Sequence, residues 1–171
     1  AVETPDQVIF DLDPDKGVPV ERVREAALTV RTRLDELGFG SFLKTSGGKG
    51  FHVVMPLKPK AGWDEIKAFA RDFAKAMEQA QPKLYTATLS KQARKGRIFV
   101  DYLRNGRGAT AIAPFSTRAR PGAAVAMPVA WEMLEEGLAP DAFKAQEIMD
   151  KGLPADAWAE FFAPKRALKG R

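Results

Sequence analysis

The sequence predicts an α+β fold in which helices pack on a mixed, largely antiparallel sheet. Two long segments, 20–37 and 63–80, place apolar residues three and four positions apart, as amphipathic helices do. Short apolar runs at 8–13, 42–45 and 51–55 are typical of strands. Only five residues join the last two runs, so they form a hairpin. The strand-then-helix passages on either side of it are also compatible with an α/β sandwich.

Glycine and proline mark the limits of the two long helices. Gly38 ends the first, Gly62 precedes the second, and Pro82 follows it. The elements expected beyond Pro82 are shorter: a strand at 84–89, a basic loop at 90–96, a strand at 97–104, a turn at 105–108, a strand at 109–115, an edge strand at 124–128, a helix at 131–136 and a helical turn at 158–162.

The composition is that of one domain in a reducing compartment. We expect a domain over residues 1–163 and a basic tail or linker over 164–171. The 171 residues include no cysteine, which excludes disulfides and Cys-ligated zinc and fits the cytoplasm. No apolar run approaches the ~20 residues that span a membrane, and the acidic start is unlike a signal peptide. We therefore expect no membrane partner.

Two carboxylates lie within the first strand. Successive side chains in a strand point to opposite faces, so Asp11 and Asp13 share one face while Phe10 and Leu12 point to the other. Crowding two negative charges is unfavourable unless a cation such as Mg2+ or Mn2+ neutralises them. The alternative is structural, because Pro14 could simply end the strand in a turn.

A glycine-rich loop joins the two strands of the predicted hairpin. Gly47 and Gly48 let backbone N–H groups approach an anion closely, and Ser46, Lys49 and His52 add side-chain donors. The spacing is not that of a Walker A loop, which requires Gly-x-x-x-x-Gly-Lys-Ser/Thr and a following helix. A hairpin loop without function is the alternative.

Basic residues are concentrated in the segment 82–122. It contains nine Lys or Arg residues and one acid, Asp101, a net charge of +8 in a chain whose total is +5. Such a block favours a phosphate-rich partner, although a solvated surface is the simpler explanation for any single residue. Asp101 follows an apolar run, as Asp11 and Asp13 do. Three such acids, a Ser/Lys/His loop and an arginine-dense block together suit two-metal phosphoryl transfer.

Four motifs, in this order, resemble the polymerase domain of bacterial DNA ligase D, a member of the archaeo-eukaryotic primase superfamily. They are Phe-Asp-Leu-Asp-Pro, Lys-Thr-Ser-Gly-Gly-Lys-Gly-Phe-His, Phe-Val-Asp-Tyr-Leu-Arg-Asn with Gly-Ala-Thr-Ala, and Ser-Thr-Arg-Ala-Arg-Pro. The similarity extends from about Pro5 to Phe162. It implies the catalytic core of the primase fold, and a bacterial, nucleoid-associated protein.

The resemblance also implies roles for individual residues. Asp11, Asp13 and Asp101 would be the catalytic residues and would bind two Mn2+ or Mg2+ ions. The nucleotide site would be formed by Ser46, Gly47, Gly48, Lys49, His52, Arg104, Arg118 and Arg120, with Lys44 beside it. In addition, the basic loop suggests that Lys91, Arg94, Lys95 and Arg97 bind DNA.

Family members extend primer 3′ ends with ribonucleoside or deoxyribonucleoside triphosphates, and fill gaps at broken DNA ends during non-homologous end joining. The implied partners are therefore DNA, nucleoside triphosphates, the end-binding protein Ku, and linked ligase and nuclease domains. In the family a further N-terminal segment precedes this module and carries part of the DNA-binding surface. The sequence is thus expected to be a piece of a longer polypeptide or a minimal form that works with another chain.

Two other functions fit some of these features. A non-catalytic nucleic-acid-binding or Ku-binding module would explain the basic block and leave the acids structural. Another metal-dependent phosphotransferase or a nuclease would use the same acids, but a nuclease has no triphosphate for the Ser-Gly-Gly-Lys-Gly-x-His loop to hold.

Overall fold

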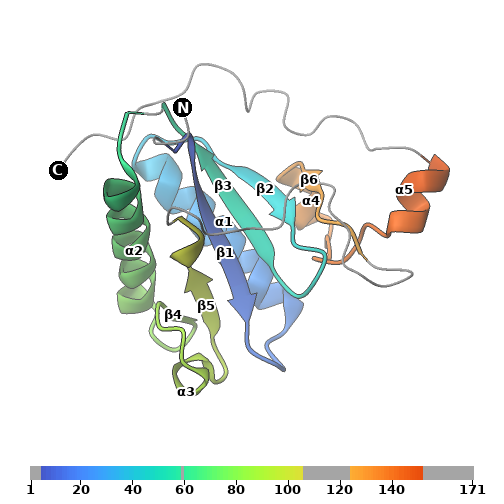
Figure 1. Ribbon diagram of the computed structural model, residues 1–171. Helices are drawn as coiled ribbons and strands as arrows, with labels where there is room; N and C mark the ends of the chain where they lie inside the picture. The colour runs from blue at the N-terminus through green and yellow to red at the C-terminus, as the bar shows by residue number, and fades with distance from the viewer. Residues whose placement is uncertain (1–4, 59, 106–123, 152–171) are drawn as a thin grey trace.

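The structure is a computed structural model that describes residues 5–58, 60–105 and 124–151. Its strands form one sheet in the order β4-β5-β1-β3-β2-β6 (Figure 1). The central strand β1 (Gln7–Pro14) pairs in antiparallel fashion with β3 (Phe51–Pro56) on one side and β5 (Ile98–Asp101) on the other. Among the described strands only β4 and β5 run parallel, so the predicted mixed and largely antiparallel sheet is confirmed.

The remaining elements are the other three strands of this sheet and the helices. They are α1 (Val20–Glu36), β2 (Phe42–Thr45), α2 (Trp63–Ala80), β4 (Tyr85–Thr86), α3 (Lys91–Arg94), the 3₁₀ helix η1 (Leu103–Asn105), β6 (Pro128–Val129), α4 (Glu132–Glu135) and α5 (Ala145–Lys151). The two long helices and the hairpin β2–β3 therefore lie where the sequence places them.

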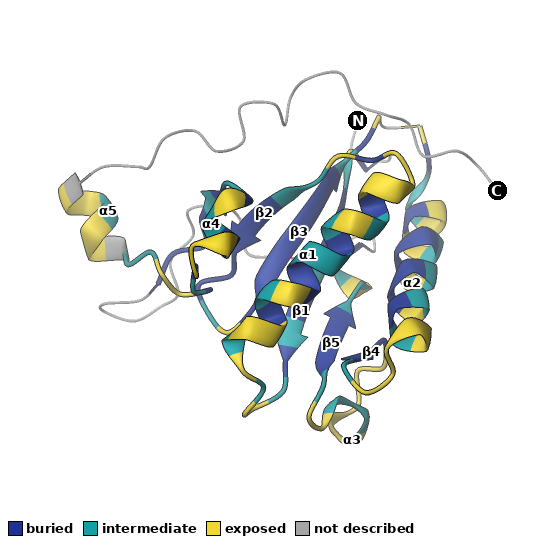
Figure 2. Cartoon of the chain, turned by 180° about the vertical axis from the view of Figure 1, so that it is seen from behind, coloured by how far each residue is buried: buried dark blue, intermediate teal, exposed yellow. Residues whose placement is uncertain are grey.

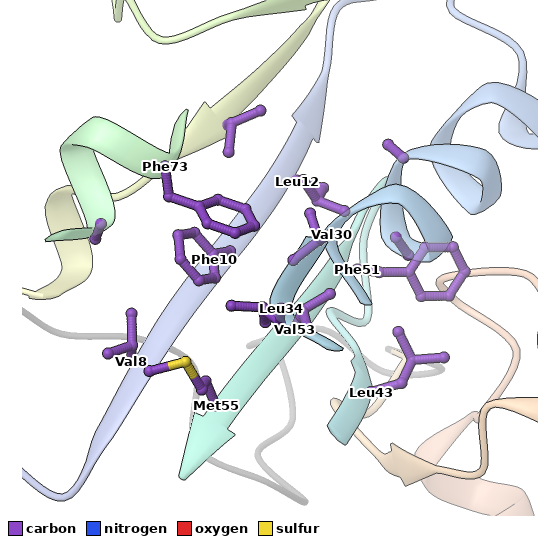
Figure 3. Packing of buried hydrophobic residues seen from close by; sticks show 14 of the residues in the cluster. Val8, Phe10, Leu12, Val30, Leu34, Leu43, Phe51, Val53, Met55 and Phe73 are labelled. Carbon is purple, nitrogen blue, oxygen red and sulfur yellow. The ribbon is translucent and has the colours of Figure 1, made fainter. Parts of the chain in front are cut away.

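Both long helices cover the same face of the sheet, and their buried sides turn toward it (Figure 2). Phe10 of β1 points toward these helices, and the centre of its ring lies 4.6 Å from the centre of the Phe73 ring on α2 (Figure 3). Leu34 of α1 and Val53 of β3 pack in the same cluster. Burying a side chain of this size stabilises the fold by about 1.5–3 kcal/mol. Strand alternation then places Asp11 on the opposite face, away from α1 and α2.

Two short elements differ from the prediction for local reasons. The strand expected at 84–89 ends at Thr86, because the Thr86 hydroxyl accepts a hydrogen bond from Thr88 N–H at 3.1 Å. In the expected loop, the Ser90 hydroxyl caps the short helix α3 by accepting from Ala93 N–H at 3.2 Å.

The strand expected at 97–104 ends at Asp101. The Asp101 carboxylate accepts a hydrogen bond from Leu103 N–H at 2.9 Å and turns the chain into η1, which also takes up Asn105 of the expected turn.

The C-terminal part is only partly as predicted. Helix α4 is confirmed, but the edge strand expected at 124–128 consists of a bridge between Ala124 and Lys144, and of β6. Helix α5 was not predicted, since its residues are mostly exposed and lack a regular apolar stripe. The expected strand at 109–115, the turn at 158–162 and the tail at 164–171 lie outside the described residues. Across the described ranges, none of the helices has the length and apolar character to cross a membrane.

Gly50 is a position where any side chain would collide with the central strand. A Cβ built there would lie 1.8 Å from the carbonyl oxygen of Leu12, whereas a Cβ at Gly40 would meet nothing within 4 Å. We expect Gly50→Ala to lower the free energy of unfolding by about 1–3 kcal/mol or more. Gly40→Ala should leave the free energy of unfolding nearly unchanged. Urea unfolding of both variants tests this. Equal stability of the two would contradict the close approach of β3 to β1.

Candidate functional site

A row of four polar side chains crosses the face of the sheet opposite α1 and α2. The strand register places Asp11 opposite His52 on one side and opposite Asp101 on the other, and places His52 opposite Lys44. Residues directly opposite each other in neighbouring strands point to the same face. Lys44, His52, Asp11 and Asp101 therefore form what we call the polar row, with one residue from each of β2, β3, β1 and β5.

His52 links the basic and acidic halves of the polar row. Its Nε2 lies 3.2 Å from Asp11 Oδ1, and only 2% of the residue is exposed. The buried Nδ1 has no hydrogen-bond partner in the described part of the chain. In a neutral ring that donates from Nε2, Nδ1 is an acceptor, so a ligand with a donor could satisfy it.

Lys44 is an almost fully buried ammonium group at the edge of the row, with 3% of the residue exposed. Burial lowers its pKa to about 8, and the Asp11 carboxylate opposes this shift. Removing a cation from water is unfavourable, so a second anion at this position would be favoured.

Asp13 forms an ion pair with Arg94. Arg94 Nη2 lies 2.6 Å from Asp13 Oδ2, and its guanidinium carbon lies 5.4 Å from the centre of the Phe99 ring. Burial nevertheless raises the pKa of Asp13, helped by the neighbouring Asp11 charge and opposed by Arg94. Arg94, which the basic loop suggested as a DNA contact, thus supplies counter-charge within the site.

Arg104 lies between the other two acids. Its Nε is 3.9 Å from Asp11 Oδ2 and 3.8 Å from Asp101 Oδ2. Burial raises the pKa of Asp101, and the Leu103 N–H bond opposes this rise. The side chain of Arg104 is 38% exposed, so one guanidinium, open to solvent, is shared by two carboxylates.

The glycine-rich loop is held together by Ser46. The Ser46 hydroxyl oxygen accepts from Gly48 N–H at 3.0 Å and from Gly50 N–H at 3.3 Å, while Gly47 N–H donates to Pro140 O at 3.0 Å. These three backbone donors thus have partners within the chain, unlike the anion-facing donors that the sequence suggested. The loop can still offer the Ser46 hydroxyl proton and the exposed Lys49 side chain.

The other predicted DNA contacts occupy different environments. Arg97 donates to Pro82 O at 3.2 Å and lies 4.0 Å from Glu78, so it holds neighbouring segments together. Lys91 and Lys95 are exposed on and after α3. Arg118 and Arg120 lie outside the described residues.

Sequence reasoning missed two contributors to this geometry. Nothing in the spacing pairs Arg94 with Asp13, because they are 81 residues apart. Asn105 is buried and hydrogen-bonded to the backbone of β1, but in the sequence it was assigned to a turn. For His52, by contrast, the sequence did carry a signal, because it lies two residues after the glycine-rich loop, near the start of a strand.

The donor set suits a hard divalent cation, although the side chains do not converge on one point. Asp11, Asp13 and Asp101 come from adjacent strands and offer carboxylate oxygens, which Mg2+ and Mn2+ prefer. In the described ranges, no three acidic or histidine side chains are grouped closely enough to hold a metal ion as they stand. Burial, with a smaller contribution from the neighbouring carboxylates, raises the pKa values of Asp13 and Asp101, so further positive charge would stabilise their ionised forms.

Comparisons with known proteins agree on one family. Residues 1–158 match the family described as the LigD primase-polymerase domain. The multifunctional non-homologous end joining protein LigD of Pseudomonas aeruginosa is 39% identical over 170 residues, which are 98% of this chain and 20% of that protein. The LigD protein of Mycolicibacterium smegmatis is 34% identical over 160 residues, 92% of this chain and again 20% of the relative.

A solved structure gives the same answer. The polymerase domain of Mycobacterium tuberculosis ligase D in complex with DNA has a TM-score of 0.76 and 34% identity, and the match covers 88% of this chain and 53% of that domain. The chain thus spans about a fifth of the LigD proteins and about half of the solved domain. On sequence and fold together, the chain belongs to the LigD primase-polymerase domain family.

Proposed function

We propose that the chain is the catalytic core of a DNA-directed nucleotidyltransferase that extends primer 3′ ends with nucleoside triphosphates during non-homologous end joining and gap filling. The observation that carries this proposal is the polar row. It brings two carboxylates, a histidine and a buried lysine from four strands onto one face, next to the Ser46 loop. Acids and phosphate-binding groups on one surface are what phosphoryl transfer requires.

Asp11, Asp13 and Asp101 would hold two divalent cations, Mn2+ or Mg2+. When bound by these residues, such ions would polarise the attacking 3′ oxygen and stabilise the charge of the leaving pyrophosphate. In the present geometry Arg94 and Arg104 provide the counter-charge to these carboxylates. The Asp13 oxygen bound by Arg94 cannot serve a cation at the same time, so the guanidinium competes with a cation at this carboxylate.

The basic half of the site would bind the triphosphate. Ser46 has a hydroxyl proton to donate, because its oxygen already accepts from the loop. Lys44, buried two strands from Asp11, would place a positive charge against a phosphate oxygen, and Lys49 adds a second cation from the loop. Gly47 and Gly48 keep the loop small enough for close approach.

The proposed DNA surface lies at the Asp13 end of the site. The exposed Lys91 and Lys95 flank Arg94 there, where a phosphate backbone could neutralise them. Arg118 and Arg120 remain predicted nucleotide contacts. DNA binding is supported by the M. tuberculosis polymerase domain, whose structure is a complex with DNA. Ku and linked ligase and nuclease domains are proposed as partners because the P. aeruginosa relative is a multifunctional end-joining protein.

One observation favours the second candidate, a non-catalytic nucleic-acid-binding or Ku-binding module. Arg94 and Arg104 already neutralise the acids, as structural ion pairs would. Such a module would bind DNA in a salt-dependent way but would show no Mn2+-dependent affinity for a nucleoside triphosphate.

Primer extension on gapped DNA with Mn2+ tests the proposal, using the polypeptide at its natural full length. We expect Asp11→Ala to reduce extension at least about 100-fold, because the charge it removes would stabilise the bound cations. Asp35→Ala, the same change on the exposed side of α1, is the matched control and should extend primers like the parent. If Asp11→Ala extends primers as well as the control, the catalytic assignment is wrong.

The raised pKa of Asp101 predicts opposite effects of one substitution on stability and activity. The pKa of Asp101 is higher in the folded protein than in the unfolded chain, so the folded protein holds the proton of this carboxyl more tightly. The free energy of unfolding therefore falls as the pH rises from the unfolded-state pKa through the folded-state pKa of Asp101. At neutral pH Asp101 is ionised, and its full destabilising effect on the fold is present. Asp101→Asn should therefore raise the melting temperature, by roughly 2–4 °C for each kcal/mol of stability gained. The same substitution should abolish primer extension. The gain should vanish below about pH 3, where both side chains are neutral.

Asp15→Asn is the control of opposite sign. Its carboxylate accepts from Gly96 N–H at 2.8 Å, and this bond lowers its pKa, so neutralisation should give no stability gain at neutral pH. Thermal melts in the presence of a chelator, at neutral and acidic pH, separate the two variants. A fall in the melting temperature of Asp101→Asn at neutral pH would show that Asp101 is a structural ion-pair partner.

A further inference from the structure

Asn105 is one of the few polar side chains buried in the described part of the molecule, with 3% of the residue exposed. Its Oδ1 accepts from Ile9 N–H at 2.8 Å, and its Nδ2 donates to Ile9 O at 2.7 Å and to Tyr102 O at 3.0 Å. One carboxamide thus satisfies both backbone groups of a residue in the central strand. Asn105 follows directly after Arg104 and lies four residues beyond Asp101.

The strand register explains why this bond pair exists. Strand β1 pairs with β5 up to Asp11 and Asp101, and Ile9 would face residue 103 if β5 continued. Instead the chain turns into η1, the short olive turn that follows β5 in Figure 1 and lies against α2 and β1. The Asn105 carboxamide supplies the donor and the acceptor that the N–H and C=O of residue 103 would have given in a continuing strand. Ile9 therefore keeps its hydrogen bonds although the partner strand has ended.

The early end of β5 determines where the charged groups lie. Only because the chain leaves the strand can Leu103 N–H donate to Asp101 Oδ1 at 2.9 Å. The same turn brings Arg104 Nε to 3.9 Å from Asp11 Oδ2 and 3.8 Å from Asp101 Oδ2. A continuing strand would place residues 101 and 103 on the same face and residue 104 on the other, so Arg104 would point away from the acids.

We propose that Asn105 is a positioning residue for the acidic site: its carboxamide replaces the missing strand opposite Ile9 and thereby fixes Asp101 and Arg104 relative to Asp11. Asparagine suits this role because its short side chain carries a donor and an acceptor side by side. Aspartate would lose the donors and bury a charge, and alanine would leave the Ile9 groups without partners. That Asn105 thereby supports cation binding rests on the proposed function. That Asn105 holds the turn into η1 does not.

Amide hydrogen exchange tests the geometric part. In Asn105→Ala we expect the Ile9 and Leu103 amides to exchange at least about 10-fold faster, while the α1 amides keep the parent's protection. Asn105→Ser is the milder variant if alanine prevents folding. If Leu103 keeps its protection while Ile9 loses it, Asn105 merely completes β1 and the positioning role is overturned.

Calorimetric titration with Mn2+ tests the consequence for the site. We expect Asn105→Ala to weaken Mn2+ binding by about 10-fold or more, the usual effect of losing a group that orients a ligand. Leu34→Ala is the control, because it destabilises the core on the opposite face without touching the acids. A similar loss of affinity in Leu34→Ala would mean that Asn105 acts through stability alone, which would overturn the proposal. If the parent itself does not bind Mn2+, the proposed function fails, and the exchange data still decide the role of Asn105.

Discussion

The site depends on the crowding of three carboxylates on one face of adjacent strands. Asp11 and Asp13 are two positions apart on β1, and Asp101 lies directly opposite Asp11 on β5. Burial and mutual repulsion raise the pKa values of Asp13 and Asp101, so the fold needs positive charge at this place. Arg94 and Arg104 supply it in the present structure, and in our proposal divalent cations supply it during catalysis.

The alternation of β1 links this charged site to the stability of the fold. Phe10 and Leu12 point into the helix-covered core, and the acids between and beside them point the other way. A shift of the register by one residue would bury the carboxylates under α1 and α2 and expose the aromatic core. The large apolar area beneath the sheet therefore fixes the acids in place, and the close approach of Gly50 to Leu12 O fixes the loop beside them.

The sequence was sufficient for the parts that follow a simple period. Both long helices, the hairpin and the shared face of Asp11 and Asp13 could be read from the spacing of apolar residues. The pairing of His52 with Asp11 and of Arg94 with Asp13 could not, because strand register and long-range ion pairs depend on how distant segments meet. The early end of β5 was missed for a similar reason. The hydrogen bonds that stop the strand come from the Asp101 carboxylate and the Asn105 side chain, whereas Tyr102 and Leu103 extend the strand-like pattern past the point where the strand ends.

The central claim is that the carboxylates of β1 and β5 bind divalent cations, and counting bound Mn2+ by electron paramagnetic resonance tests it most directly. In the presence of a nucleoside triphosphate that cannot be hydrolysed, we predict two Mn2+ ions per chain. We predict weaker binding and fewer bound ions in Asp11→Asn and Asp101→Asn, and an unchanged count in Asp35→Asn. An equal number of ions in the parent and in the two site variants would contradict the account.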